Sequence, residues 1–280
     1  MPELTRESLI QCINSRHHYA TTGGPSGRVL LSVSMSFDGP ATQYLDDPMI
    51  YEICKTQPCA EAIMGDIVHL PVGNSHLKVS IDAASPVHCI DIFNGLEHLE
   101  CYRPYSESDL GDRICVLWEG AEYRGRFRAV SWDGSAHFNK AKISSTSAVN
   151  FFNCDKTIDS LSSSDLAWKS VTTGNFAGFI TKLHDSRSGS IEIETELINE
   201  TVALADIGYK DTILDASNIL PRGIRLFRLP NENTHKSVSI ERKLEPQTRR
   251  DNPFYVRITL EDGTQAWSSP IYVLREVAKS

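Results

Sequence analysis

The chain has 280 residues, of which 40% are hydrophobic and 23% are charged, and this composition is that of an ordinary globular protein with a substantial core. The formal net charge of −8 argues against a nucleic-acid-binding surface, because such a surface needs clustered Lys and Arg to neutralise phosphates. No apolar run approaches the roughly 18 residues that a membrane span needs, so we predict no membrane span.

The first element in the chain is a predicted short helix that ends near Arg16. Thr5 can cap it, and Glu7 lies in the first turn, where the helix dipole favours negative charge. Leu9, Ile10 and Ile13 then share one face. A glycine-rich connector, TTGGPSG, follows.

Alternating patterns predict strands from residue 28 onward. In RVLLSVSMSF, Val29, Leu31, Val33, Met35 and Phe37 point to one side, which is typical of a half-buried strand. HLKVSIDA alternates in the same way. VHCIDIFNGLEHLECY predicts a hairpin, with Asn94-Gly95 as a type I′ turn. A short helix within residues 51–64 is a weaker alternative.

The second half of the chain also predicts strands. GRFRAVSW leads to a turn expected at Asp133-Gly134, and GSIEIETELI places its glutamates outward. Near the end, Asp262-Gly263 connects two strands in FYVRITLEDGTQAWSSPIYV. Short strands with frequent turn signals predict a mainly β fold of the sandwich class.

No local motif predicts catalysis. His17 and His18 are adjacent, and neighbours on an extended chain point to opposite faces, so they cannot easily bind one metal ion. The connector lacks the lysine and the strand-loop-helix order of a phosphate-binding loop. No GxSxG, HxH or HExxH occurs. We therefore predict no catalytic residue, no metal and no cofactor from local spacing, although a site assembled from distant residues stays open.

The cysteines and tryptophans allow two interpretations each. The seven cysteines are an odd number without a CxxC pair, which favours reduced thiols over a disulfide framework. This count and the absence of a signal peptide favour a cytoplasmic location, although the start of a fragment would say nothing about targeting. Trp118, Trp132 and Trp168 are possible ligand-facing aromatics, but core packing is the commoner fate of Trp in a sandwich.

Four separated blocks resemble one family. ELTRESLIQCINSRHHYATTG begins at Glu3, LWEGAEYRGRFRAVSWDGS spans 117–135, WKSVTTGNFAG spans 168–178, and PFYVRITLEDGTQAWSSPIYV spans 253–273. Together they resemble the C-terminal β-rich region of a metallohydrolase-like family of the PHP type (polymerase and histidinol phosphatase), long labelled a domain of unknown function. In that family the first block closes the catalytic barrel. The family's upstream metal elements, HxH, Glu and Asp-x-His, are absent from this chain.

The resemblance implies a domain organisation. Residues 1–27 would be the helix and connector that end a PHP catalytic domain, and residues 28–115 would pair with 250–275 as an immunoglobulin-like β-sandwich. Residues 116–249 would be a large inserted β-rich region. Seven residues are expected to face the catalytic domain at the seam: Arg16, His17, His18, Tyr19, Thr21, Thr22 and Gly23.

The function that the resemblance implies is a non-catalytic C-terminal β module of a PHP-type metal-dependent hydrolase-like protein. Its role would be docking, stability or substrate presentation for a PHP catalytic domain in cis or in trans. Two alternatives remain open. One is a stand-alone carbohydrate- or protein-binding sandwich, which exposed aromatics on one face would favour. The other is a metal-dependent hydrolase with an unrecognised site among the His, Asp and Glu residues, which a cluster of three or more such side chains within coordination distance would favour. Oligomeric state is not predicted.

Overall fold

The computed structural model describes residues 3–23, 28–151, 156–248 and 251–275. Its fold is mainly β, with one short α-helix near the N-terminus, α1 (Arg6–Asn14), and strands that pack as sandwiches. The mainly β prediction is therefore confirmed. The predicted cap of α1 is also present, since Ser8 N donates a hydrogen bond to Thr5 Oγ1 at 3.1 Å. None of the helices in the described ranges is both long and apolar enough to cross a membrane.

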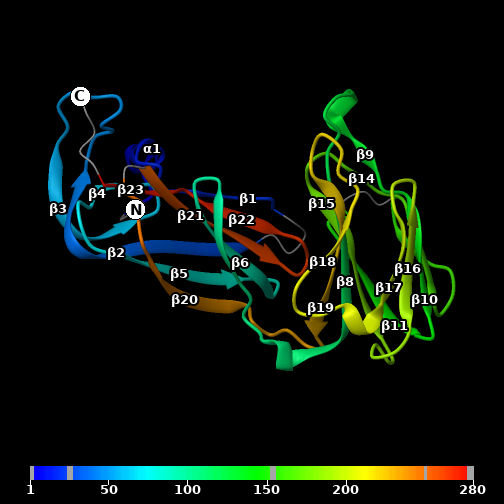
Figure 1. Cartoon of the computed structure of the whole chain (residues 1–280). Coiled ribbons are helices and arrows are strands. Elements are labelled where there is room, and N and C mark those ends of the chain that lie inside the picture. The colour runs from blue at the N-terminus through cyan, green and yellow to red at the C-terminus, as the bar shows by residue number, and fades with distance from the viewer. Residues whose placement is uncertain (1–2, 24–27, 152–155, 249–250, 276–280) are drawn as a thin grey trace. The chain divides into compact units, whose positions relative to one another are not determined.

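The chain divides into two compact units, which Figure 1 shows. Unit 1 contains residues 1–104 and 235–280, and unit 2 contains residues 105–234. Unit 2 is therefore an insertion, but it begins 11 residues and ends 15 residues earlier than the 116–249 predicted. The reason is strand pairing: β8 (Leu110–Gly120) pairs inside unit 2, while β20 (Ser237–Leu244) pairs with β5 (Ser75–Ala83) of unit 1.

Unit 1 is built from strands that come from both ends of the chain. One run of strands has the order β1-β22-β21-β6-β7, and the other has the order β23-β4-β2-β5-β20, with β3 also paired to β2. Strand β23 pairs with both β21 and β4 and so joins the two runs. The remaining strands are β1 (Tyr19–Thr21), β2 (Val29–Tyr44), β3 (Thr56–Ile63), β4 (Ile67–His69), β6 (Val87–Asn94), β7 (Glu97–Tyr102), β21 (Asp251–Leu260), β22 (Gln265–Ser268) and β23 (Ile271–Leu274).

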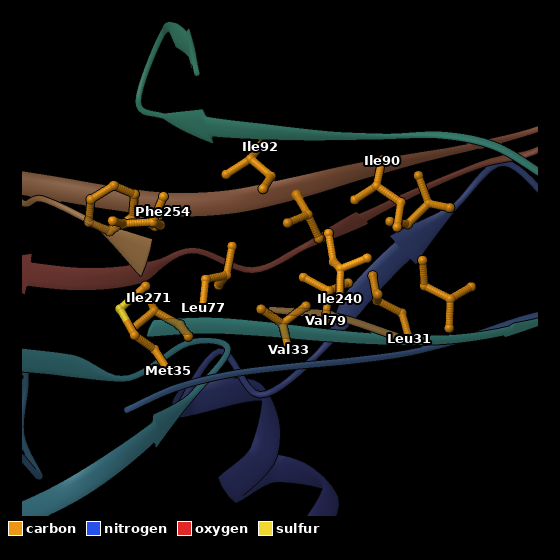
Figure 2. Packing of buried hydrophobic residues seen from close by; sticks show 14 of the residues in the cluster. Leu31, Val33, Met35, Leu77, Val79, Ile90, Ile92, Ile240, Phe254 and Ile271 are labelled. Atoms are coloured by element: carbon orange, nitrogen blue, oxygen red, sulfur yellow. The ribbon is translucent and has the colours of Figure 1, made fainter. Parts of the chain in front are cut away.

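The core of unit 1 lies between these two runs of strands. Figure 2 shows Ile90, Ile92 and Phe254 from one side pointing toward Val33 and Val79 from the other. The predicted inward face of β2 is confirmed: Val29, Leu31, Val33 and Met35 are buried, and the partly buried Phe37 packs against the same core. Burial of such aliphatic side chains supplies most of the favourable free energy of folding.

The two predicted hairpins of unit 1 are present, but one turn differs. Asn94 pairs with Glu97, so the central turn residues are Gly95 and Leu96 rather than Asn94 and Gly95. Gly95 has a φ of 60° and Leu96 does not have a positive φ, which fits a type II′ turn and not the type I′ turn predicted. In the terminal hairpin Gly263 has a φ of 87°, as its three-residue loop requires.

The described residues of unit 2 form two five-stranded sheets and one two-stranded pair. The sheet orders are β12-β13-β10-β16-β17 and β11-β15-β8-β19-β18, and β9 pairs with β14. Its core includes Trp118, Phe138 and Phe179. The strands besides β8 are β9 (Val130–Ser131), β10 (Gly134–Asn139), β11 (Ile143–Val149), β12 (Ile158–Ser160), β13 (Asp165–Trp168), β14 (Val171–Thr172), β15 (Phe176–Leu183), β16 (Ser190–Thr195), β17 (Asn199–Ala203), β18 (Thr212–Asp215) and β19 (Arg222–Pro230).

Two local predictions were wrong. Residues 51–64 contain no α-helix, because Thr56–Ile63 form β3. Gly134 is not a turn residue but begins β10, and a Cβ placed there would lie 2.4 Å from the carbonyl oxygen of Glu194. Glycine at this position therefore permits a close approach of two strands rather than a reversal of the chain.

Candidate functional site

The segment predicted as a domain seam lies largely against unit 1 itself. Arg16 donates from Nε to the carbonyl oxygen of Gly65 at 3.1 Å and forms an ion pair with Asp47 at 3.3 Å. His17 Nε2 lies 2.8 Å from Asp66 Oδ1, and Asp66 is buried. The neighbouring histidine, His18, is exposed, so the two imidazoles point to different environments, as the extended backbone predicted.

The rest of this segment forms an edge strand. Tyr19 and Thr21 lie in β1, which pairs with β22, and the Tyr19 hydroxyl donates to the carbonyl oxygen of Val29 at 2.7 Å. Thr22 Oγ1 accepts a hydrogen bond from Gln265 N at 3.0 Å. Gly23 is exposed with a φ of 62°, and residues 24–27 of the connector lie outside the described residues. The polar groups of the seam thus hold the segment on the sandwich.

Gly65 provides a test of this attachment. Its φ is 99°, and a Cβ there would lie 2.5 Å from the backbone of Arg16. We expect Gly65→Ala to loosen the attachment of residues 15–18, because both the strained φ and the steric overlap oppose the present contact. Limited digestion with trypsin should cleave after Arg16 several-fold faster. Gly174→Ala is the matched control, since Gly174 has a φ of 107° and its nearest contact is at 4.0 Å. Equal cleavage rates in both variants would contradict this role of Gly65.

The N-terminal helix exposes its apolar face. No residue of α1 is buried, and Leu9, Ile10 and Ile13 are about half exposed. The loop between β2 and β3 also exposes apolar side chains. The Arg16–Asp47 ion pair links this loop to the end of α1. We define the N-terminal apolar surface as the exposed apolar residues of both segments: Leu4, Leu9, Ile10, Ile13, Leu45, Met49, Ile50, Tyr51 and Ile53.

The three candidate ligand-facing tryptophans are buried in the core of unit 2. Trp118 stacks on Trp168 with ring centroids 4.8 Å apart and an interplanar angle of 9°. Each indole N–H has a partner inside the unit: Trp118 donates to Ser170, Trp132 to Thr172, and Trp168 to the carbonyl oxygen of Trp132. The prediction of ligand-facing aromatics at these positions is therefore corrected, because their faces are covered and their polar atoms are satisfied.

A groove of about 430 Å³ opens at one end of unit 2. Its charged lining residues are Glu122, Arg124 and Arg222. Arg222 forms an ion pair with Glu122, and the guanidinium of Arg124 lies over the ring of Tyr123. Tyr123 and Ile219 add exposed apolar surface. With two arginines against one carboxylate, the lining of the groove has a small excess of positive charge.

A group of potential metal ligands lies on the β6–β7 hairpin of unit 1. Cys89, Asp91 and Cys101 are the one such group among the residues that the structure describes, and their ligand atoms all lie within 4.8 Å of one another. A hydrogen bond between the two thiols raises the pKa of Cys89, which burial raises further, and lowers the pKa of Cys101. Asp91 also accepts from His98 Nε2 and Arg257 Nη2, each at 2.9 Å.

Local spacing missed this group because eleven residues separate Cys89 from Cys101. The hairpin prediction alone could not have found it: with the turn at residues 95 and 96, a regular ladder would pair Asp91 with Glu100. A register shift between Ile92 and Phe93 places Asp91 opposite Cys101 instead, on the face that Cys89 shares. Cross-strand neighbours on one face lie close enough for their side chains to meet. Cys154 lies outside the described residues.

Comparisons with known proteins found no match for this chain. No family model matches the chain, and neither a curated protein nor a solved structure matches it.

Proposed function

We propose that this chain is a non-catalytic β module that docks onto a PHP-type metal-dependent catalytic domain, in cis or in trans, through the N-terminal apolar surface. The observation that carries the proposal is α1, a helix of nine residues without one buried side chain. Docking would stabilise the catalytic domain or present substrate to it.

An exposed helix of this length needs further packing. Isolated helices shorter than about 12–15 residues are marginal in water, and most helical stability in proteins comes from burial of an apolar face. Leu9, Ile10 and Ile13 form such a face in solvent. Met49 and Ile53 are also exposed, on the loop that the Arg16–Asp47 ion pair links to the end of α1. Clustered exposed apolar residues are typical of an interaction surface.

The resemblance supports a catalytic domain as the occupant. Its first block includes α1 and the following segment up to Gly23, and in the PHP-type family this block closes the catalytic barrel. The apolar face of α1 would then be the face that packs on that barrel. The ligands of the catalytic metal and the hydrolytic chemistry would belong to the partner domain.

Burial of the three core tryptophans weakens the alternative of a stand-alone carbohydrate-binding sandwich. Trp118, Trp132 and Trp168 cannot offer stacking faces to a sugar while they form the core of unit 2. The docking proposal needs no exposed aromatic platform.

The first step of the experiment is to translate the reading frames that flank the gene for this chain. We expect one of them to encode HxH and Asp-x-His elements, and the encoded domain to form a stoichiometric complex with this chain when co-expressed. Leu9→Glu/Ile13→Glu should weaken that complex at least about 100-fold, because lost burial and the desolvation of two carboxylates together cost at least about 3 kcal/mol. Isothermal titration calorimetry measures the affinity.

The matched control is Leu30→Glu/Leu96→Glu. Both leucines are at least as exposed as those of α1 and belong to unit 1, but neither is part of the N-terminal apolar surface. We expect this variant to bind like the parent chain. The absence of such a reading frame, or equal affinity of both double variants, would contradict the proposed function.

A further inference from the structure

Two cysteines and an aspartate meet on one face of the β6–β7 hairpin. Cys89 and Asp91 lie two residues apart on β6, so their side chains share a face, and Cys101 on β7 pairs with Asp91. Cys89 and Asp91 are buried, and Cys101 is exposed. The distance from Cys89 Sγ to Asp91 Oδ2 is 3.9 Å.

We propose that Cys89, Asp91 and Cys101 bind a thiophilic divalent cation of the zinc class, with a water molecule as the fourth ligand. Tetrahedral zinc binds thiolate sulfur at about 2.3 Å and carboxylate oxygen at about 2.0–2.2 Å, so its ligand atoms lie about 3.5–3.8 Å apart. Ligand atoms that already lie within 4.8 Å of one another need only small side-chain adjustments to reach this geometry.

The charges around the group favour a divalent ion. Two thiolates and one carboxylate carry three negative charges, of which the cation would balance two. Arg257 supplies a positive charge at Asp91, since its Nε and Nη2 lie 3.1 and 2.9 Å from Asp91 Oδ2, and Arg103 adds a positive charge near the two thiols. A carboxylate can bind a metal and accept hydrogen bonds at the same time, and such outer partners orient metal ligands.

His98 completes this outer arrangement. Its Nε2 lies 2.9 Å from Asp91 Oδ1, so Asp91 is held from both of its oxygen atoms. The ring of His98 also contacts Phe93 edge to face, with centroids 5.1 Å apart. An aspartate fixed in this way loses little conformational freedom when it binds an ion.

Two sulfur ligands select the class of cation. Thiolates are soft donors that favour zinc and similar ions over magnesium or calcium, which favour oxygen. Among the described strands, β7 pairs only with β6. The cation would therefore add a second link between β7 and β6. This site is separate from the N-terminal apolar surface and does not depend on the docking proposal.

The test uses the full chain, reduced and stripped of metal, and titrated with Cd²⁺ and Zn²⁺. We expect one equivalent of Cd²⁺ to produce a thiolate-to-metal charge-transfer band and Zn²⁺ to displace it. Cys101→Ala should weaken binding at least 10-fold, and because Cys101 is exposed this variant should keep its fold, which circular dichroism checks. Cys89→Ser/Cys101→Ser should abolish the band.

Cys54→Ser/Cys59→Ser is the matched control, since it also removes two free thiols from unit 1 and lies away from the hairpin. It should bind Cd²⁺ like the parent chain. An unchanged band in the Cys89→Ser/Cys101→Ser variant would overturn the proposal. A reduced protein that binds no Cd²⁺, with Cys89 and Cys101 found as a disulfide in the untreated protein, would overturn it as well.

Discussion

Replacement of Trp118 by alanine is expected to lower the free energy of unfolding of unit 2 by about 3–5 kcal/mol, the usual effect of removing a large buried aromatic side chain. Trp118 is fully buried and stacks on Trp168, and Phe179 packs against it with ring centroids 6.1 Å away. Its Nε1 donates to Ser170 Oγ at 2.9 Å, so the substitution creates a cavity and also removes the partner of a buried hydroxyl.

Urea denaturation followed by far-ultraviolet circular dichroism measures this effect. Leu161→Ala is the matched control, because Leu161 belongs to the same unit and is mostly exposed, and it should change the free energy by less than about 0.5 kcal/mol. A loss below about 1 kcal/mol for Trp118→Ala would mean that Trp118 is not part of a packed core.

Asn252→Ala should destabilise unit 1 by at least about 3 kcal/mol. The fully buried amide of Asn252 accepts from Asn94 Nδ2 at 3.0 Å and from Gln247 N at 2.7 Å. It donates to the carbonyl oxygens of Gln247 and Val273, each at 3.1 Å. Alanine removes all of these bonds, and each buried polar group that loses its partner costs about 1–3 kcal/mol.

The control for Asn252 is an amide in solvent. Gln57 is exposed and donates from Nε2 to Gln43 Oε1 at 2.9 Å. Gln57→Ala should therefore leave the free energy of unfolding of unit 1 nearly unchanged. Thermal unfolding measures the free energy of unfolding of both variants. An equal loss in Asn252→Ala and Gln57→Ala would contradict the assigned role of Asn252.

Periodicity in the sequence predicted the elements whose two faces differ. The buried and exposed sides of β2 alternate as the spacing of Val29, Leu31 and Val33 indicates, and Phe254, Val256 and Ile258 of β21 are buried in the same manner. In these strands the local pattern and the packed structure agree, because one face meets the core and the other meets water.

Local patterns could not predict features that depend on distant partners. Gly134 looked like a turn residue, but the strand that passes close to it is β16, about 60 residues later in the chain. The parallel pairing of β23 with β4 joins segments about 200 residues apart, and no local signal encodes it. Whether Trp118 is buried or exposed likewise depends on Trp168, which belongs to the other five-stranded sheet.

The candidate seam illustrates the same limit. Sequence blocks directed attention to Arg16 and His17, whose side chains prove to be engaged with Asp47 and Asp66. The amphipathic pattern of residues 5–16 identified the helix and its apolar face, but the pattern could not reveal that the described residues leave this face unburied. That information came only from burial in the folded chain.

Hydrogen–deuterium exchange across residues 4–14 tests the docking account most directly. We predict fast exchange of the α1 amides in the purified chain, because the helix is short and its apolar face lies in solvent. In the complex with the co-expressed PHP-type domain, the same amides should exchange at least about 10-fold more slowly. Unchanged exchange in α1, with new protection elsewhere on the chain, would contradict the assignment of the N-terminal apolar surface as the docking site.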